Sequence, residues 1–221
     1  MITILFLFLN ISPFYKADFL SQLGRSISIF SNPAGLGIQP GAELFFTYHH
    51  QPKTLTSGLE LGNVGFGIKK IDSLLYFEVG VGYKLPGAVS FGYSYQFADT
   101  SNHIFGLLCR PSASFSIGCR TTLGEKKVMR GGFGIKPFIK YLTLCFDLEY
   151  EGIEDTLCYF YGGILGPMQG VRLQFYTDDD FNWHAGVELS SERINLAGSY
   201  SSVNKKLSGG VIFSAQRYPG N

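Results

Sequence analysis

Residues 75–83 read LYFEVGVGY, and every second position of this stretch is large and apolar while the positions between are mostly glycine or polar. Residues 182–189, NWHAGVEL, repeat the alternation in the second half of the chain. A period of two indicates a β-strand, because successive side chains of a strand point to opposite faces of the sheet. The pattern recurs from about residue 43 to the C-terminus, so the sequence predicts an all-β protein.

The composition indicates what covers the apolar sheet face, since no helical pattern follows the strands. The 221 residues include 20 Phe, 13 Tyr and 28 Gly, but only 16% are charged, against roughly a quarter in soluble domains. A formal net charge of +1 argues against a nucleic-acid partner, which would require many phosphate contacts. We therefore expect membrane lipid to be the main partner of the apolar face.

The alternating runs are numerous, short and separated by turn residues such as Pro86-Gly87, Glu151-Gly152 and Gly166-Pro167. A run of about ten residues is long enough for a tilted strand to cross the hydrocarbon, and an even strand number is typical of bacterial outer-membrane barrels. The sequence thus predicts a transmembrane antiparallel β-barrel of about 14 strands over residues 43–218, in a Gram-negative-type outer membrane. The strands are expected near 43–50, 54–62, 63–70, 74–85, 88–97, 103–110, 113–122, 130–138, 141–150, 156–166, 168–177, 181–191, 193–202 and 207–217. A soluble secreted β protein is the alternative, with its polar face outward.

The ionisable residues of the strands fall mostly on one face. A membrane barrel requires this, because a charge on the lipid face costs about 2 to 4 kcal/mol at the bilayer midplane. We expect a polar lumen that includes Arg120, Lys136, Asp147, Arg172 and Glu188. Glycines on the same face leave room for a segment that fills a narrow lumen; they include Gly82, Gly92 and Gly118.

Residues 1–17 differ from the strands and read as a signal peptide. Ile2–Leu9 is an almost unbroken apolar run, too short for a transmembrane helix and suited to a signal-peptide core. We expect export across the inner membrane. A buried N-terminal strand is the alternative.

Residues 18–42 lack the alternation. Apolar residues at helical spacing come first, and Asn32-Pro33-Ala34 with Gly35 then breaks any regular element. We expect a short, helical, plug-like segment ahead of the first strand. Its candidate plug or ligand-binding residues are Phe19, Leu20, Leu23, Asn32, Pro33 and Ala34.

Four short stretches resemble the N-terminal region of FadL-like and PorV-type (PorV/PorQ) outer-membrane proteins. They are Asp18-Phe19-Leu20-Ser21, Gly24-Arg25-Ser26, SNPAGLG at 31–37 and the aromatic LFFTYH at 44–49. The resemblance implies a fourteen-stranded barrel with a small N-terminal segment in its lumen, and transport of a hydrophobic solute. This chain is shorter than typical fatty-acid transporters and has almost no extracellular loops.

The sequence shows no catalytic or metal-binding pattern. The four histidines lack HExxH spacing, no GxSxG motif occurs, and the four cysteines form no CxxC pair. We predict no enzyme activity, no metal and no cofactor.

Two classes of function follow from the predicted barrel. One is transport of a hydrophobic small molecule, with residues 18–42 as plug. The other is structural, in which the barrel anchors or shuttles a protein partner at the outer membrane. Pro219-Gly220 also fits the start of a linker, so the barrel is alternatively a module that precedes another domain.

Overall fold

A computed structural model describes residues 14, 19–22, 24–38, 41–50, 53–97, 101–124, 127–138, 141–152, 155–202 and 205–215. Apart from Phe14, the predicted signal peptide at 1–17 lies outside these residues, as do Leu23 and the C-terminal end of the predicted barrel after residue 215. The signal peptide therefore stays a prediction.

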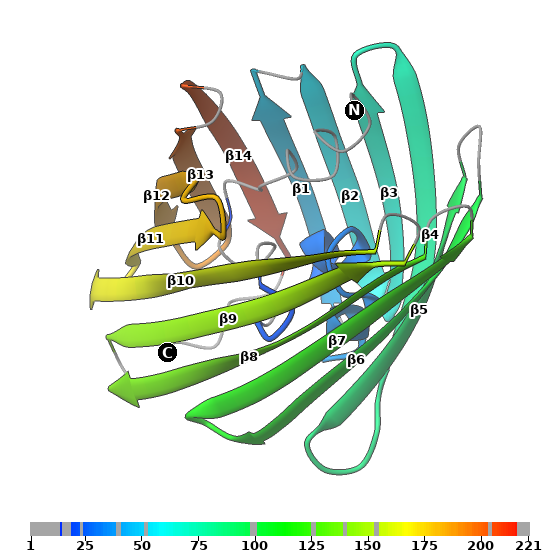
Figure 1. Cartoon of the computed structure of the whole chain (residues 1–221), viewed down its shortest axis with the longest axis horizontal. Helices are drawn as coiled ribbons and strands as arrows, with labels where there is room; N and C mark the ends of the chain where they lie inside the picture. Colours follow the sequence, from blue (N-terminus) through cyan, green and yellow to red (C-terminus); the bar gives the residue numbers. More distant parts are fainter. Residues whose placement is uncertain are drawn as a thin grey trace.

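The strands form one closed antiparallel barrel, which confirms the predicted fold (Figure 1). The alternating residues fold this way because one face is apolar and the other polar, and closure pairs every strand on both sides. The strands are β1 Gly41–His49, β2 Thr54–Gly62, β3 Val64–Ile71, β4 Leu74–Lys84, β5 Val89–Phe97, β6 Asn102–Ser112, β7 Phe115–Gly124, β8 Val128–Phe138, β9 Leu142–Glu151, β10 Thr156–Met168, β11 Val171–Asp178, β12 Trp183–Ser190, β13 Ile194–Ser201 and β14 Lys206–Ser214. The predicted ranges match these fourteen strands within a few residues.

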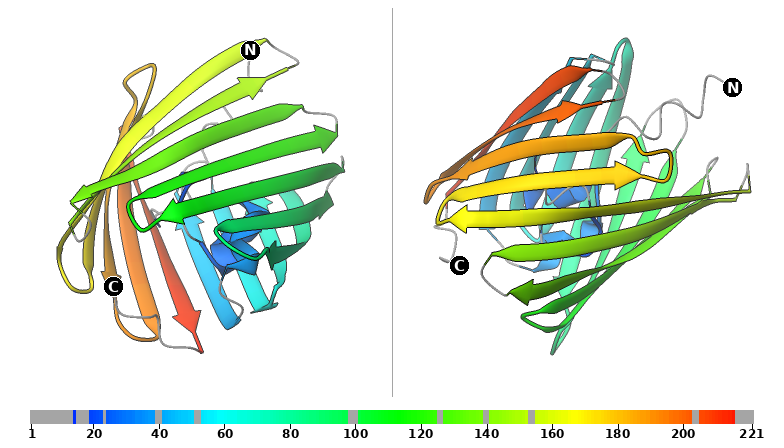
Figure 2. Two further views of the ribbon diagram at one scale, coloured as in Figure 1. Left: turned by 90° about the horizontal axis from the view of Figure 1, so that it is seen from below. Right: turned by 60° about the vertical axis from the view of Figure 1, so that its left-hand side comes forward.

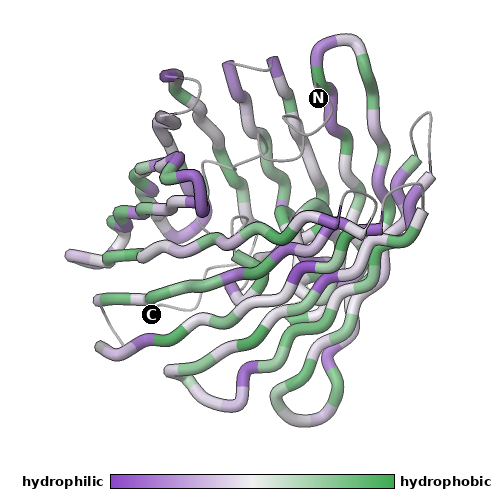
Figure 3. The backbone as a smooth tube through the Cα atoms, in the orientation of Figure 1, coloured by the Kyte–Doolittle hydropathy of each residue, from purple (hydrophilic) through white to green (hydrophobic). Residues whose placement is uncertain are grey.

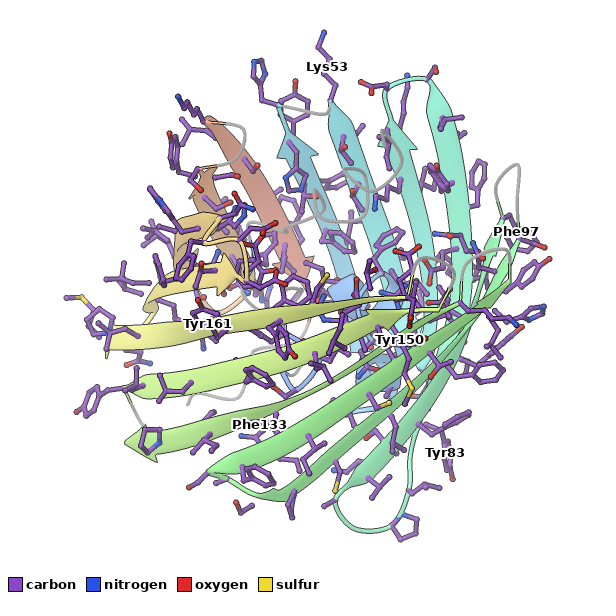
Figure 4. The ribbon with its side chains drawn as sticks, viewed as in Figure 1. Lys53, Tyr83, Phe97, Phe133, Tyr150 and Tyr161 are labelled. Carbon is purple, nitrogen blue, oxygen red and sulfur yellow. The ribbon has the colours of Figure 1, made fainter. Side chains whose placement is uncertain are left out.

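Pairing of β1 with β14 closes the barrel, with Glu43 opposite Ser214 and His49 opposite Ser208. Because the strand number is even, β1 begins and β14 ends at the same end of the barrel, which we call the termini end. The connections β2–β3, β4–β5, β6–β7, β8–β9, β10–β11 and β12–β13 lie there too. The other seven connections lie at what we call the far end, where Figure 4 shows Lys53.

The two faces of the wall differ as predicted. Exposed apolar side chains point outward along the strands, with examples at Phe77, Leu144 and Phe175. The alternation is visible along the backbone in Figure 3, and the aromatic side chains labelled in Figure 4 are all exposed. The outer surface is therefore suited to lipid and the inner surface to polar contacts.

Three strands end in the same irregularity at the termini end. Register shifts occur at Cys109/Ser112, Ile135/Phe138 and Leu165/Met168, and each spans one proline, Pro111, Pro137 or Pro167. Proline has no N–H to donate to the ladder, so pairing is interrupted there. The sequence placed Gly166-Pro167 in a turn between strands, which is wrong, because β10 continues through both residues to Met168.

Residues 19–22 and 24–38 lie inside the barrel, and we call them the inner segment (Figures 1 and 2). They contain two short 3₁₀-helices, η2 Ser26–Ile29 and η3 Pro33–Gly37, and no α-helix occurs among the described residues. The predicted helical character is therefore limited to single turns, since Gly24 and Pro33 disfavour a longer helix. None of the described helices is long and apolar enough to cross a membrane.

Candidate functional site

A row of glycines brings the inner segment onto the barrel wall. Gly82, Gly92, Gly106 and Gly118 lie on the inner face of β4, β5, β6 and β7, and we call them the glycine row. Gly82 pairs with Gly92, and Gly92 pairs with Gly106. A Cβ atom at these positions would collide with residues of the inner segment, at Gly92 with the backbone of Pro33 and Ala34. Glycine is required at these positions because the backbone of the inner segment touches the backbone of the wall strands.

Asn32 links three parts of the lumen through its side-chain amide. Its Oδ1 accepts a hydrogen bond of 3.2 Å from the Ala34 N–H and so caps η3, whose first residue is Pro33. Its Nδ2 donates to the carbonyl oxygens of Leu20 and of Leu107 in β6, both at 3.2 Å. Asn32 is 3% exposed and Ala34 is fully buried. The predicted Asn-Pro-Ala turn thus fixes the inner segment to itself and to the wall.

Two predicted lumen residues hold the backbone of the inner segment. Arg120 of β7 donates from Nη1 to the carbonyl oxygens of Phe30 (3.0 Å) and Ser31 (3.1 Å). Asp147 of β9 accepts from the Leu20 N–H at 3.0 Å. The same carboxylate is bound by Arg130 of β8, with Nη2 at 2.9 Å.

Arg25 is the centre of a buried ionic cluster that the sequence analysis missed. Its Nη1 donates to Ser214 Oγ at 3.1 Å, and its guanidinium lies 3.7 Å from Glu43 and 3.5 Å from Glu60. Glu43 also accepts from the N–H and hydroxyl of Ser26, at 3.1 and 2.7 Å. Arg25 is a charged residue inside a stretch of mostly apolar and small residues. This contrast was the one signal in the sequence that could have indicated a buried ionic contact at Arg25.

Apolar side chains of the inner segment fill the lumen beside these polar groups. Ile27, Ile29 and Leu36 pack against Phe45 of β1 and Ile212 of β14, together with Phe14. A second cluster surrounds Phe19 and consists of Cys145, Phe160, Ile164 and Tyr176. Phe19 meets the Tyr176 ring edge-on at 5.5 Å.

The remaining predicted lumen residues, Arg172 and Lys136, also lie on the inner face of the wall. Arg172 forms an ion pair of 3.2 Å with Glu188 across β11 and β12, as expected for two inward side chains. Lys136 follows Gly134 on the inner face of β8 and lies at the termini end. Of the predicted site residues, five belong to the inner segment: Phe19, Leu20, Asn32, Pro33 and Ala34. Arg120 and Asp147 of the wall bind this segment. Leu23 lies outside the described residues.

The inner segment occupies part of the lumen and contacts the wall on several strands. Among the described residues, no group of three or more His, Cys, Asp or Glu side chains could hold a metal ion. Arg25, Arg130 and Arg172 each face an acidic side chain, and Arg120 binds backbone carbonyls. The inner segment is therefore held from several sides, through β1, β14, β6, β7 and β9.

This architecture is that of outer-membrane β-barrels. Omp33, an outer membrane protein of Acinetobacter baumannii, matches with a TM-score of 0.59 and 10% identity, covering 80% of this chain and 99% of Omp33. A triple mutant of the Rhodopseudomonas blastica porin matches with a TM-score of 0.51 and 11% identity, covering 79% of this chain and 99% of the porin. At these identities the likeness concerns the fold alone.

No protein-family model matches the chain, and no curated protein matches it. The resemblance to FadL-like and PorV-type proteins therefore stays a prediction, because the solved structures named above are an outer membrane protein and a porin.

Proposed function

We propose that this protein is an outer-membrane barrel whose lumen is closed by the inner segment, and that it serves a structural role as anchor or shuttle for a partner protein. The observation that carries this proposal is the attachment of the inner segment to the wall. Its backbone rests on the glycine row, and its polar groups bind five strands. The proposal involves no catalysis and no cofactor.

The energetics support a closed barrel. Withdrawing the inner segment would take Arg25 away from the Glu43 and Glu60 carboxylates, which are at most 2% exposed. The buried Asp147 carboxylate would lose the Leu20 N–H and keep Arg130 of the wall. A hydrogen bond to a charged group contributes about 1.5 to 3 kcal/mol, and an uncompensated buried charge costs about 3 to 5 kcal/mol. Spontaneous opening should therefore be rare.

We further propose that the chain is exported with residues 1–17 as signal peptide and inserted in an outer membrane. The exposed apolar side chains around the wall support this location, because a soluble barrel would expose them to water. Aromatic residues near both ends support it too, such as Phe97 and Tyr150 at the far end and Tyr83 and Tyr141 at the termini end.

Transport of a hydrophobic small molecule is the second candidate, in line with the FadL-like resemblance. The observation that favours it is the apolar cluster of Phe19 with Phe160, Ile164 and Tyr176. These side chains would offer an apolar surface inside the barrel if Phe19 moved. Ile164 lies beside the register shift at Leu165/Met168, where pairing of the wall is interrupted.

The test is solute flux into liposomes that contain the purified barrel. We expect negligible flux of small sugars and ions with the full chain, and clear flux after deletion of residues 18–36. Because the deletion removes Arg25 and exposes its acidic partners, Gly92→Val serves as a second variant that leaves the chain complete. Gly209→Ala is the control, since a Cβ there meets no atom closer than 3.7 Å.

Free flux through the full chain would contradict the closed barrel. Negligible flux in the full chain and in both lumen variants would indicate that the wall itself closes the lumen. It would contradict the proposed role of the inner segment. Uptake of a fatty acid by the full chain in the same liposomes would favour the transport candidate.

A further inference from the structure

One charged side chain is an exception to the uncharged outer face of the wall. Among the described strand residues, Lys70 of β3 is the single Lys, Arg, Asp or Glu at an outward position. It follows the exposed residues Phe66 and Ile68 at a spacing of two, and it pairs with Leu55 and Leu75, which are also exposed. Lys70 is itself exposed and precedes the last residue of β3, so it lies at the far end of the outer face.

Two further lysines lie near Lys70, in the neighbouring connections of the far end. Lys53 ends the β1–β2 connection (Figure 4), and its carbonyl oxygen accepts a hydrogen bond of 3.0 Å from the Asp72 N–H of the β3–β4 turn. Lys205 lies in the β13–β14 connection, and β14 is paired with β1. Both lysines are exposed. We call Lys53, Lys70 and Lys205 the basic arc.

The basic arc concentrates positive charge on one side of the far end. None of its three lysines forms an ion pair among the described residues. Asp72 is the single acidic residue in the three connections, which read HQPK at 50–53, DS at 72–73 and SVNK at 202–205. The β9–β10 and β11–β12 turns are acidic instead, with exposed Asp155, Asp179 and Asp180. The charge around the far end is therefore uneven.

The surroundings of the basic arc select the kind of ligand. The wall beside it is apolar, because Tyr48, Leu55 and Leu207 point outward there and are exposed. Positive charge at the edge of an apolar face is complementary to an anionic lipid, whose headgroup carries the charge and whose acyl chains are apolar. A soluble protein would have to displace lipid from the outer face to reach Lys70.

We propose that the basic arc binds a lipid with a negatively charged phosphate headgroup at the far end of the outer face. The inference goes beyond the proposed structural function and rests on the proposed insertion of the barrel in a membrane. Lys70 is tolerated on the outer face because the penalty for an outward charge falls from the midplane to the interface. Each Lys near an anionic lipid surface strengthens binding by about fivefold. The acyl chains of the bound lipid lie against Leu55 and Leu207.

Native mass spectrometry of the full-length barrel in detergent, titrated with phosphatidylglycerol or with phosphatidylcholine of the same acyl chains, tests this inference. Phosphatidylcholine has the same phosphate, but its choline group cancels the negative charge. We expect the native barrel to bind phosphatidylglycerol at least about tenfold more tightly than phosphatidylcholine. The triple variant Lys53→Glu, Lys70→Glu, Lys205→Glu should lose this preference. Lys70→Ala should weaken phosphatidylglycerol binding by about fivefold, and it serves alone if the triple variant does not fold.

The matched control Lys84→Glu, Lys127→Glu, Arg193→Glu changes the net charge by the same amount and should keep the preference of the native barrel. Equal affinities of the native barrel for the two lipids, or equal loss in the control, would overturn the inference. Displacement of the lipid by glycerol phosphate, which has no acyl chains, would show that the site binds soluble anions and would overturn the inference too.

Lipid binding and solute flux are separate measurements. A barrel that conducts freely and still prefers phosphatidylglycerol refutes only the closed barrel of the proposed function. A barrel that stays closed and shows no preference between the two lipids refutes only the basic arc as a lipid site. Folding of each variant is checked by heat-modifiable gel mobility.

Discussion

Asn32 shows at the residue scale how one buried amide organises the inner segment. Its three hydrogen bonds connect η3, the turn at Leu20 and strand β6. Removing the amide leaves two carbonyl oxygens inside the barrel without this donor, and each unsatisfied buried group costs about 1 to 3 kcal/mol.

Asn32→Ala should therefore loosen the inner segment while the barrel stays folded. We expect a loss of about 2 to 4 kcal/mol from two unsatisfied carbonyls and a lost cap. Limited proteolysis of the folded barrel in detergent should show faster cleavage between residues 19 and 38. Asn182→Ala, which removes a contact to Asp178 in the β11–β12 turn at the far end, is the control and should leave that cleavage rate unchanged.

Substitution of Gly92 tests the close contact between the backbone of β5 and the backbone of the inner segment. A Cβ atom there would strike the Pro33 and Ala34 backbone, so Gly92→Ala should destabilise the barrel by about 1 to 3 kcal/mol. Gly209→Ala places a methyl group on the open outer face and should be neutral or slightly stabilising. Urea unfolding followed by the fluorescence of Trp183, the single tryptophan, measures both. Equal midpoints for the two variants would contradict the close contact.

The sequence predicts some of these residues and misses others for a physical reason. Asn32 could be predicted because a capping residue before Pro-Ala is a local signal. Glu43, Glu60 and Arg25 could not be grouped, because their contact depends on the path of the inner segment through the lumen, which no local pattern records.

At the scale of elements, the pair β8–β9 carries a buried ion pair in contact with the inner segment. The Asp147 carboxylate is fully buried, bound by Arg130 and by the Leu20 N–H. The Arg130 guanidinium also lies 4.7 Å from the centre of the Phe160 ring of β10. One ion pair thus joins three neighbouring strands to the inner segment.

A double-mutant cycle should reveal this coupling. Arg130→Met leaves a buried carboxylate without its cation, and we expect a loss of about 3 to 5 kcal/mol. Adding Asp147→Asn removes the charge and should restore part of that loss, with a coupling energy of about 1 to 3 kcal/mol. Urea unfolding measures the four corners of the cycle. Additive effects would contradict the assignment of Asp147 as the partner of Arg130.

The strands were predictable as elements and the inner segment was not. Each strand can be recognised in the sequence by its period of two, because this pattern depends only on which residues face outward. The helical spacing of the apolar residues from Phe19 to Ile27 predicts a short helix, whereas the described residues form turns and two 3₁₀-helices. Packing against the glycine row and capping by Asn32 determined that conformation instead.

At the scale of the whole molecule, the separation of apolar side chains on the outer face from polar side chains on the inner face determines whether lipid or water covers the barrel. Val79 lies at the middle of β4 and Leu75 near its far end, and both point outward. The outer and inner faces of the wall could be predicted from the alternation. The closure of the barrel around its lumen could not, because it depends on the register of all fourteen strands.

A charge on the outer face should show a dependence on depth if the barrel spans a bilayer. Val79→Arg should cost about 2 to 4 kcal/mol and Leu75→Arg about 0 to 1 kcal/mol, because the penalty falls from the midplane to the interface. Unfolding in lipid vesicles measures both variants. Equal small costs would indicate that water, and not lipid, covers the outer face.

Single-channel recording in planar bilayers tests the closed barrel most directly. The full chain should insert without producing steady conductance steps, while Gly92→Val and the deletion of residues 18–36 should produce open steps. Large, steady conductance of the full chain, unchanged in Gly92→Val, would contradict the account.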